Sequence, residues 1–598
     1  MLETQRATAA GTVAPMAVSE AAATPRPGSA DETLGRMADV AERAAGETVA
    51  FYRPERGQWL PEPWSKARKL RREVAAALAA NGIARGDRVA VISQTRWEWG
   101  SIDLGILSVG AVTVGIYPTS TPAQVDYILR HSRAEVVILE NEAQAARLAE
   151  VIAALPAHPR VVVIASPGFA EFLGHGDGAR AELLAADVRP EDLATLVYTS
   201  GTTGPPKAVA LTHRNLLATS KLGSTFLGAT SEDTAVSYLP MAHVLTRVNY
   251  YGYVQSRGTA WFAESLEKVN EAWLAARPTI LSTVPRVLEK AQQKILKAVE
   301  DGNPRRRRIF ARALATGLKV FELKERGEPV PFLLSLEHRL WDRLVFQKVR
   351  ARLGWDRVRF AMCGGAPIRV EILKFFHALG VVVIEGFGMT ETASPISINH
   401  PQKWKLGTVG RALPGIEIKL AEDREILVRS PGLFARYEGD EESTRAAFNA
   451  EGWFQTGDVG ELDAEGYLRI TDRKKDLIKT AGGKFVAPQN VEALLKADAR
   501  LSQAVVFGDE RPYLVGLFTI NVELMPKFDE AAAQQIVAEA VARANAQLAP
   551  YETVKRFKVL PEDFAIDNEL LTPTLKVKRR AVEAKFRTLI DSLYAKGE

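Results

Sequence analysis

The sequence predicts an α/β protein built from several units. We expect a large N-terminal domain, with two α/β sheet subdomains and a small β subdomain, followed by a small α+β C-terminal domain. The 598 residues exceed a single compact core, because domains average about 150 residues. Apolar strands alternate with helical patterns over residues 45–165 and 215–400. Over 405–472 the pattern changes to short alternating runs separated by Pro, Gly and Asp, which indicates the β subdomain.

Composition excludes several classes of protein. A hydrophobic content of 46% and a charged content of 25% are typical of globular chains, and a net charge of +5 is too small for a nucleic-acid-binding arm. The single cysteine, Cys363, excludes a disulfide framework within the chain and a thiol cluster for zinc. No uninterrupted apolar run reaches the roughly 20 residues that span a bilayer, and no basic start precedes an apolar run. We therefore expect a cytoplasmic protein.

The first 30 residues are rich in Ala, Thr, Pro and Ser and have few large apolar side chains. Such a segment cannot offset the entropy cost of ordering, so we expect residues 1–30 to be a disordered tail. Its scarcity of acidic residues leaves a targeting peptide open as an alternative.

The first α/β segment contains three apolar runs, 86–93, 111–117 and 134–140, separated by helical patterns at 97–109 and 124–133. This alternation predicts a parallel sheet that is covered by helices on both faces.

A loop rich in hydroxyl groups and glycine follows the apolar run that begins at Leu196. Gly201 and Gly204 allow backbone N–H groups to converge on an anion, and Lys207 ends the loop with a positive charge. Pro205 and Pro206 disfavour an immediate helix, so this is not a Walker loop. A phosphate site is the functional interpretation, and an ordinary surface loop is the alternative. The hydroxyl donors would be Thr199, Ser200, Thr202 and Thr203.

The second α/β segment has candidate strands at 279–283, 357–363 and 381–385. Glycine-rich turns follow two of them, at Gly364–Pro367 and at Glu385–Glu391. The carboxyl ends of strands are where α/β sheets bind ligands. We place the large domain at 31–472, a hinge at 473–475 and the small domain at 476–598.

Five short motifs, in this order and at this spacing, resemble those of the adenylate-forming, AMP-binding acyl-CoA synthetase family. They are Tyr198–Lys207, Glu385–Glu391, Thr456–Asp458, Asp472–Asp476 and Leu571–Lys576. Within the family, the chain is most similar to long-chain fatty-acid CoA ligases, through Leu239–Val244, the long segment 286–355 and the basic ending after Leu571.

The resemblance implies that a fatty acid attacks ATP to give acyl-AMP and pyrophosphate, and that the CoA thiol then displaces AMP. It also implies a mobile C-terminal domain and Mg²⁺. Lys576, His243, Thr390 and Glu391 would be catalytic, and Glu391 and Thr199 would bind the metal. Lys475 would be the hinge, and Lys479, Gly482 and Gly483 would belong to the face used in the second half-reaction. The nucleotide would contact Thr199, Ser200, Gly201, Thr202, Thr203, Gly204, Lys207, Gly364, Gly365, Ala366, Pro367, Glu385, Gly386, Phe387, Gly388, Met389, Thr390, Asp458, Arg473 and Lys576.

Several alternatives stay open at this point. The acyl group could pass to a carrier-protein thiol in place of CoA, or the protein could bind a nucleotide without catalysis. His243 could be a satisfied core histidine. Arg305–Arg308 could be a solvated helix face or a peripheral contact with an anionic membrane. The sequence gives neither the acyl chain length nor the oligomeric state.

Overall fold

The computed structural model describes residues 32–199, 206–263, 265, 267–522, 525–565, 567–572 and 576–595. The expected disordered tail at 1–30 lies outside the described residues.

The first sheet has the strand order β18-β8-β7-β4-β3-β5-β6, and β3 to β7 run parallel. Alternate residues of its strands enter different cores. Val89 and Val91 pack with helices α2 and α3, whereas Ala90 and Ile92 pack with α4 and α5. The parallel sheet with two covered faces is therefore confirmed. Its elements are α2 (Trp64–Ala80), β3 (Arg88–Ile92), α3 (Trp97–Ser108), β4 (Val112–Ile116), α4 (Pro122–Ser132), β5 (Val136–Leu139), α5 (Glu142–Ala153), β6 (Arg160–Val163), α6 (Pro167–Gly174), α7 (Gly178–Asp187), β7 (Leu193–Thr199), β8 (Lys207–Thr212) and β18 (Arg436–Tyr437).

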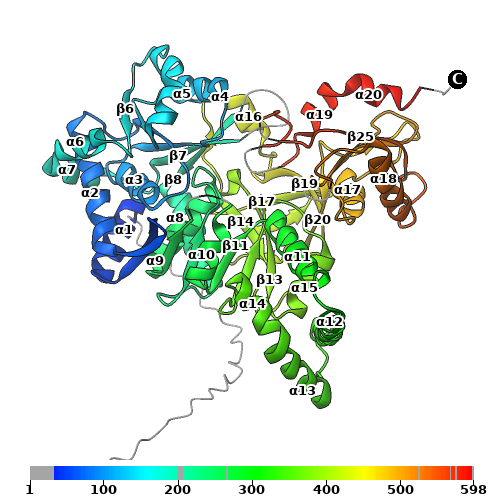
Figure 1. The fold of residues 1–598 in the computed structure, drawn as a ribbon. Helices are drawn as coiled ribbons and strands as arrows, with labels where there is room; N and C mark the ends of the chain where they lie inside the picture. The colour runs from blue at the N-terminus through cyan, green and yellow to red at the C-terminus, as the bar shows by residue number, and fades with distance from the viewer. Residues whose placement is uncertain are drawn as a thin grey trace, which may run out of the picture.

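A second β layer lies beside the first sheet (Figure 1). It joins the strand orders β2-β1-β10-β9 and β11-β12-β13-β14-β15, because the Thr279 backbone N–H donates to the Thr234 carbonyl and so places β11 next to β9. The elements are β1 (Val49–Glu55), β2 (Gln58–Pro63), β9 (Thr234–Ser237), β10 (Thr259–Phe262), α10 (Val269–Ala276), β11 (Ile280–Thr283), β12 (Phe360–Cys363), α15 (Val370–Ala378), β13 (Val383–Met389), β14 (Ser394–Ile398) and β15 (Arg411–Ala412).

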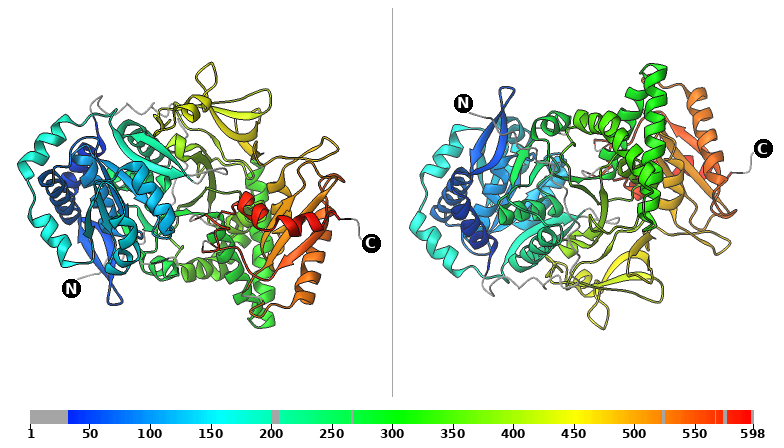
Figure 2. Two further views of the ribbon diagram at one scale, coloured as in Figure 1. Left: turned by 90° about the horizontal axis from the view of Figure 1, so that it is seen from above. Right: turned by 90° about the horizontal axis from the view of Figure 1, so that it is seen from below.

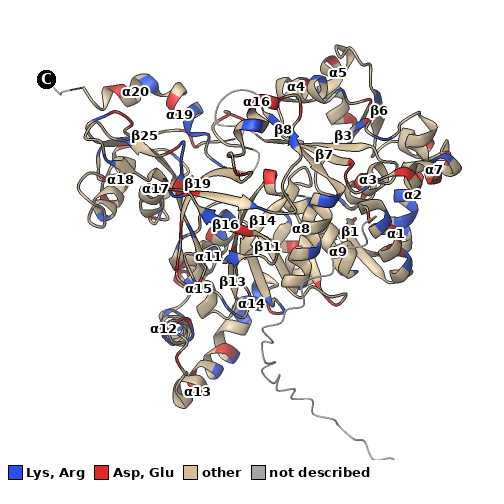
Figure 3. Cartoon of the chain, turned by 180° about the vertical axis from the view of Figure 1, so that it is seen from behind, with Lys and Arg blue, Asp and Glu red and all other residues tan. Residues whose placement is uncertain are grey.

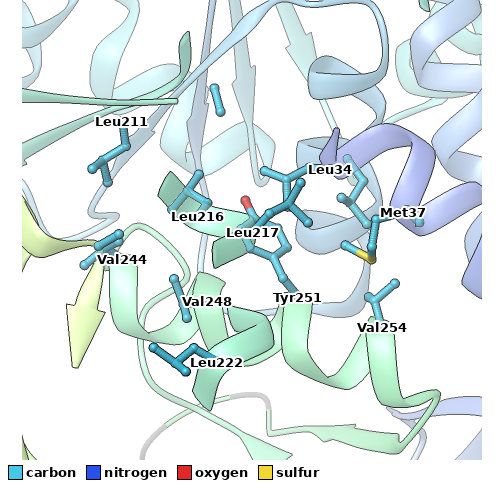
Figure 4. Close-up of a cluster of buried hydrophobic side chains, with 14 of the residues drawn as sticks. Leu34, Met37, Leu211, Leu216, Leu217, Leu222, Val244, Val248, Tyr251 and Val254 are labelled. Atoms are coloured by element: carbon cyan, nitrogen blue, oxygen red, sulfur yellow. The ribbon is translucent and has the colours of Figure 1, made fainter. Parts of the chain in front are cut away.

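Two helices, α8 (His213–Phe226) and α9 (Val244–Ser256), fill the space between these β layers. Figure 4 shows their apolar side chains, including Leu217 and Tyr251, meeting Leu34 and Met37 of α1 (Leu34–Ala45). The same cluster takes in residues of β8 and β14, so one core joins both layers.

The prediction that Glu385–Glu391 is a turn was wrong for most of its length. Strand β13 continues to Met389 and pairs antiparallel with β14. The glycines serve close approach, since a Cβ at Gly388 would lie 2.3 Å from the Ser394 carbonyl oxygen. Only Thr390–Thr392 form a tight 3-10 turn.

The β subdomain and the C-terminal unit follow. The antiparallel sheet has the order β16-β17-β19-β20, from β16 (Glu417–Leu420), β17 (Glu425–Arg429), β19 (Phe454–Leu462) and β20 (Leu468–Arg473). The short helix α16 (Glu441–Ala446) precedes β19 in the chain. The C-terminal unit has separate cores, formed by residues from Ile478 onward. In both views of Figure 2 it lies at the opposite end of the molecule from the first sheet. Its elements are β21 (Ile478–Lys479), β22 (Phe485–Val486), α17 (Pro488–Leu495), β23 (Leu501–Phe507), β24 (Leu514–Ile520), α18 (Glu530–Asn545), β25 (Val554–Leu560), α19 (Arg579–Lys585) and α20 (Arg587–Ser592).

A helical excursion separates β11 from β12, and its helices α12 and α13 project from the body (Figure 1). It consists of α11 (Pro285–Glu300), α12 (Pro304–Glu325), α13 (Phe332–Trp341), a π-helical turn (Asp342–Phe346) and α14 (Gln347–Leu353). Among the described residues, no helix combines the length and the apolar character needed to cross a bilayer.

A buried ion pair ties the first sheet to the helices between the layers. The Arg247 guanidinium of α9 donates to both oxygens of Asp103 on α3, at 2.6 and 3.3 Å, and to the Thr195 hydroxyl of β7 at 2.6 Å. Tyr251 donates to Asp103 at 2.6 Å. The charged partners are almost fully buried, so each depends on the other to compensate its lost hydration.

We predict that Asp103→Ala lowers the free energy of unfolding of the N-terminal domain by about 3 to 5 kcal/mol, because it leaves a buried guanidinium without its counter-charge. Urea titration followed by tryptophan fluorescence measures the change. The control is Glu182→Ala, which removes the exposed partner of Arg72 and should cost about 0 to 1 kcal/mol. Equal losses in the two variants would contradict the structural role of the buried pair.

Candidate active site

The predicted phosphate loop connects the ends of β7 and β8. Thr199 and Lys207 are paired across these strands, while Ser200, Gly201, Thr202, Thr203 and Gly204 lie outside the described residues. Lys207 donates to the Ser443 hydroxyl at 2.6 Å, lies 3.9 Å from Asp440, and sits over the Tyr437 ring at 4.8 Å. Lys207 is therefore held by polar groups at the start of α16.

Glu391 lies next to this lysine. Its carboxylate is buried and accepts a hydrogen bond from the Tyr437 hydroxyl at 2.8 Å. Burial raises the pKa of Tyr437 well above its usual range, with the charge of Glu391 acting in the same direction, so the phenol stays a hydrogen-bond donor. Strand pairing brings Tyr437 here, because β18 adds to the edge of β8.

A second side of the site is formed by the loop after β12 and by the middle of β13. Gly365, Ala366 and Pro367 are exposed, and a Cβ at Gly364 would lie 3.2 Å from the Gly386 carbonyl oxygen. The backbones of the loop after β12 and of β13 therefore lie close together at the position predicted to line the purine. The half-buried residues Phe387, Gly388, Met389 and Thr390 continue this side.

Glu385 differs from the other predicted nucleotide contacts. Burial raises the pKa of its carboxyl to about 8, although the Gly407 backbone N–H acts in the opposite direction. Its Oε2 is buried and has no hydrogen-bond partner among the described residues. A neutral carboxyl at this position can donate a hydrogen bond.

Asp458 and Arg473 face each other across the β19–β20 pair. Asp458 is buried, and its Oδ1 accepts a hydrogen bond from Arg473 Nε at 3.1 Å. Burial raises the pKa of Asp458, whereas the charges of Arg473 and Lys576 lower it and the charge of Glu391 raises it. Asp458 therefore lies within range of the charges of Arg473, Lys576 and Glu391.

His243 is the N-cap of α9, and its Nδ1 accepts a hydrogen bond from the Leu245 backbone N–H at 3.2 Å. Burial lowers the pKa of His243 to about 4, and the charge of Lys576 acts in the same direction. The ring is therefore neutral at pH 7, with its proton on Nε2. The alternative that His243 is a core histidine with its hydrogen bonds satisfied is supported for Nδ1 alone among the described contacts.

Lys576 reaches the site from the C-terminal unit. Desolvation in these crowded surroundings lowers its pKa to about 8, the charge of Arg473 lowers it further, and Asp458 raises it. Its side chain keeps contact with solvent. Its backbone is held by reciprocal hydrogen bonds with Thr572, at 2.7 and 3.0 Å.

The residues predicted for the hinge and for the second half-reaction follow Arg473 in the chain. Lys475 is exposed in a turn after β20. Lys479, Gly482 and Gly483 belong to the β21–β22 hairpin, whose backbone bonds to Asp509 and Arg511 of the C-terminal unit. Gly483 adopts a φ of +73°, which suits glycine at this turn.

An apolar pocket, which the sequence analysis missed, opens between α8, α9 and the second β layer. Its walls include Gly223 of α8, Leu227 directly after that helix, Val248 and Gly252 of α9, and Phe360 of β12. The helix that carries His243 at its start thus lines the pocket further along. Helical spacing on α8 and α9 predicts only core packing, so no local signal reveals a pocket.

The chain matches two family profiles. The AMP-binding enzyme profile covers residues 38–438, and that of the AMP-binding enzyme C-terminal domain covers 475–598. The chain belongs to the AMP-binding enzyme family. The long-chain-fatty-acid–CoA ligase FadD15 of Mycobacterium bovis is 37% identical, over 94% of this chain and 98% of the relative. The peroxisomal long chain acyl-CoA synthetase 7 of Arabidopsis thaliana is 30% identical, over 90% and 82%.

Solved structures of AMP-binding enzymes share this fold. The anthranilate CoA ligase AuaEII in complex with anthranoyl-AMP superposes with a TM-score of 0.73, at 20% identity, over 93% of this chain and 97% of that chain. The predicted α/β fold, with a large N-terminal domain and a small C-terminal domain, is confirmed.

In this AMP-binding enzyme, three site residues escaped the sequence analysis: Tyr437, Asp440 and Ser443. They lie in the stretch Arg436–Ala446, where Asp440 caps α16 and reads as an ordinary helix start. Ser443 is 236 residues from Lys207, so no local pattern connects them.

We predict that Tyr437→Phe raises the Mg²⁺ concentration needed for half-maximal activity about 10-fold or more, because a hydrogen bond to a charged group contributes about 1.5 to 3 kcal/mol. Phenylalanine keeps the ring beneath Lys207. Glu391→Gln should give a larger effect, and the double variant should be no worse than Glu391→Gln alone. Tyr513→Phe, in the C-terminal unit, is the control. Strictly additive effects would show that Tyr437 does not act through Glu391.

Proposed function

We propose that this protein ligates a long-chain fatty acid to CoA through an acyl-adenylate, with release of AMP and pyrophosphate. One observation carries the proposal: Lys576 of the C-terminal unit lies within electrostatic range of Asp458 and His243, and α9 runs from His243 along an apolar pocket. The identity of 37% to a long-chain-fatty-acid–CoA ligase over nearly the whole chain supports it.

In the first half-reaction, a carboxylate oxygen attacks the α-phosphorus of ATP and pyrophosphate leaves. The neutral His243 would donate its Nε2 proton in a hydrogen bond to the carboxylate, which orients the nucleophile without neutralising it. Lys576 would stabilise the negative charge that develops on the α-phosphate and the carboxylate oxygens. Asp458 would accept from the ribose hydroxyls, and Phe387 would stack on adenine.

The residues at the metal position fit Mg²⁺. Glu391 and Thr199 offer hard oxygen ligands, and only one carboxylate oxygen of Glu391 is held by Tyr437. No cluster of three or more His, Cys, Asp or Glu ligands occurs among the described residues. A magnesium ion that takes its other ligands from phosphates and water suits such a site. When bound, it would neutralise charge on the triphosphate.

In the second half-reaction, the CoA thiolate attacks the acyl carbon and AMP leaves. We propose that rotation about Lys475, in the proposed hinge 473–475, withdraws Lys576 and brings the Lys479 to Gly483 hairpin to the site. This hairpin is bonded to the C-terminal unit, so it would move with that unit. We also propose peripheral contact with an anionic membrane, for which the exposed Arg305–Arg308 run is the support.

A panel of fatty acids from short to very long, scored by carboxylate-dependent pyrophosphate exchange and by CoA-dependent AMP release, tests the function. Exchange and AMP release that both peak with long chains would support it. Exchange without CoA-dependent release would favour a fatty acyl-AMP ligase that uses a carrier-protein thiol. Absence of exchange with any carboxylate would contradict adenylation.

We predict that Lys576→Ala slows adenylation by about 10²- to 10³-fold, as expected for the loss of one preorganised charge. Thioester formation from preformed acyl-AMP and CoA should stay near the wild-type rate, because Lys576 is withdrawn in that state. Lys475→Pro, which restricts the hinge backbone, should show the reverse pattern. Two single-turnover assays measure this. Equal slowing of both steps by Lys576→Ala would contradict the alternating-domain mechanism.

We predict that kcat/KM for ATP falls as the pH rises through about 8, because Lys576 has a lowered pKa of about 8 and loses its charge above it. The sign follows from the need for protonated lysine: activity is full below pH 8 and is lost above it. The corresponding decline of kcat should occur at a higher pH, because the phosphates of bound ATP stabilise the charged form of Lys576 and so raise its pKa. Lys576→Arg, which stays charged, should be less active but flat over this range. A wild-type decline that persists in Lys576→Arg would assign it to another group.

A further inference from the structure

The positive charge of this protein is concentrated on the projecting helices. The segment 304–354 contains thirteen Lys or Arg and five Asp or Glu, a net charge of +8, while the whole chain carries +5. The remainder of the chain is therefore slightly negative. Figure 3 shows basic residues along α12, on the side of the molecule away from the first sheet. Arg305–Arg308 form the first turn of this helix and are all exposed.

The neighbouring helix α13 presents an apolar stripe to solvent. None of its residues is buried in the described structure. The exposed side chains recur at helical spacing and continue into the π-helical turn, with exposed fractions of 47 to 79%. No other described part of the chain covers this stripe, although burying its apolar surface against a partner would be favourable. The stripe consists of Phe332, Leu333, Leu336, Leu340 and Leu344.

The apolar stripe and the arginine turn lie on the same projection. Glu337 of α13 accepts a hydrogen bond from Thr316 of α12 at 3.2 Å and lies 3.8 Å from Arg312. The two helices are joined by a short loop and pack against each other, so the later part of α13 extends toward the first turn of α12. An open recess beside the stripe is lined by His338, Arg339, Arg343 and Arg350. Of these, Arg350 is held by Asp342, whereas Arg339 and Arg343 are exposed.

We propose that the α13 stripe and the α12 arginine turn form a docking surface for an anionic phospholipid bilayer. The Phe and Leu side chains enter the boundary between headgroups and acyl chains, while the arginines and the basic recess bind headgroup phosphates. This inference names the surface for the proposed membrane contact. It is independent of the ligase reaction, because membrane binding needs no substrate.

Charge complementarity selects this occupant. A second copy of the chain would place two +8 surfaces against each other, which opposes a dimer through α13. A bilayer containing anionic lipid satisfies both the apolar and the cationic part of the surface.

The test is cosedimentation of the full chain, without substrates, with vesicles of phosphatidylcholine containing 30% phosphatidylglycerol, and with phosphatidylcholine alone. We predict binding to the anionic vesicles that weakens with salt. Replacing Arg305–Arg308 with glutamine should lower the partition coefficient about tenfold or more. Phe332→Ser, Leu333→Ser and Leu336→Ser combined should lower it by a similar factor. Both variants should keep turnover on a soluble substrate.

Matched controls come from exposed residues elsewhere. Arg180, Arg189, Lys496 and Lys555, replaced together by glutamine, remove the same charge. Val40, Leu183 and Leu274, replaced together by serine, remove similar exposed apolar surface. Controls that reduce binding as much as the test variants would overturn the proposal, as would wild-type binding that is equal for both vesicle types. A concentration-dependent dimer in sedimentation velocity, abolished by the α13 variant, would assign the stripe to a second copy and also overturn it.

Discussion

A buried guanidinium, that of Arg247, joins the first sheet to the helices that lie between the two β layers. It bonds Asp103 of α3 and Thr195 of β7 from its position on α9. Thr195 lies four residues before Thr199, where the phosphate loop begins, and Arg247 lies one helical turn after His243. The strand end that carries Thr199 and the helix start that carries His243 are thus anchored to the same charge. Because burying a charge is costly, an arrangement of these elements that separated the pair would be strongly destabilised.

The site uses burial to separate the protonation states of its groups. His243 is neutral because burial and Lys576 disfavour the imidazolium ion, and Glu385 has a raised pKa because its carboxyl is buried. Among these three residues, Lys576 is the exposed one, and it belongs to the C-terminal unit. A cation carried on a separate unit can serve one half-reaction and leave for the other, which a residue fixed in the large domain cannot do.

Charged residues are arranged in two different ways in this molecule. Within the site, opposite charges lie close together in pairs, as for Asp458 and Arg473 or Lys207 and Asp440. On α12 and α13, a net excess of positive charge lies beside exposed apolar side chains. The first pattern suits the binding of one phosphate-bearing substrate in a defined geometry. The second suits a broad surface that carries negative charge over an apolar interior.

The sequence by itself determined the α/β alternation and the order of the motifs, because these depend on strand and helix periods and on glycine and proline backbone limits. It also supplied most of the candidate site residues, through the order of the motifs along the chain. Only the tertiary structure decided which groups meet. Tyr437 reaches Glu391 because β18 pairs with β8, and the apolar pocket forms where two helices face a β layer. The glycines of β13 show the limit most clearly. Glycine marks both turns and close strand contacts, and the choice between them depended on β14, whose position the local sequence does not encode.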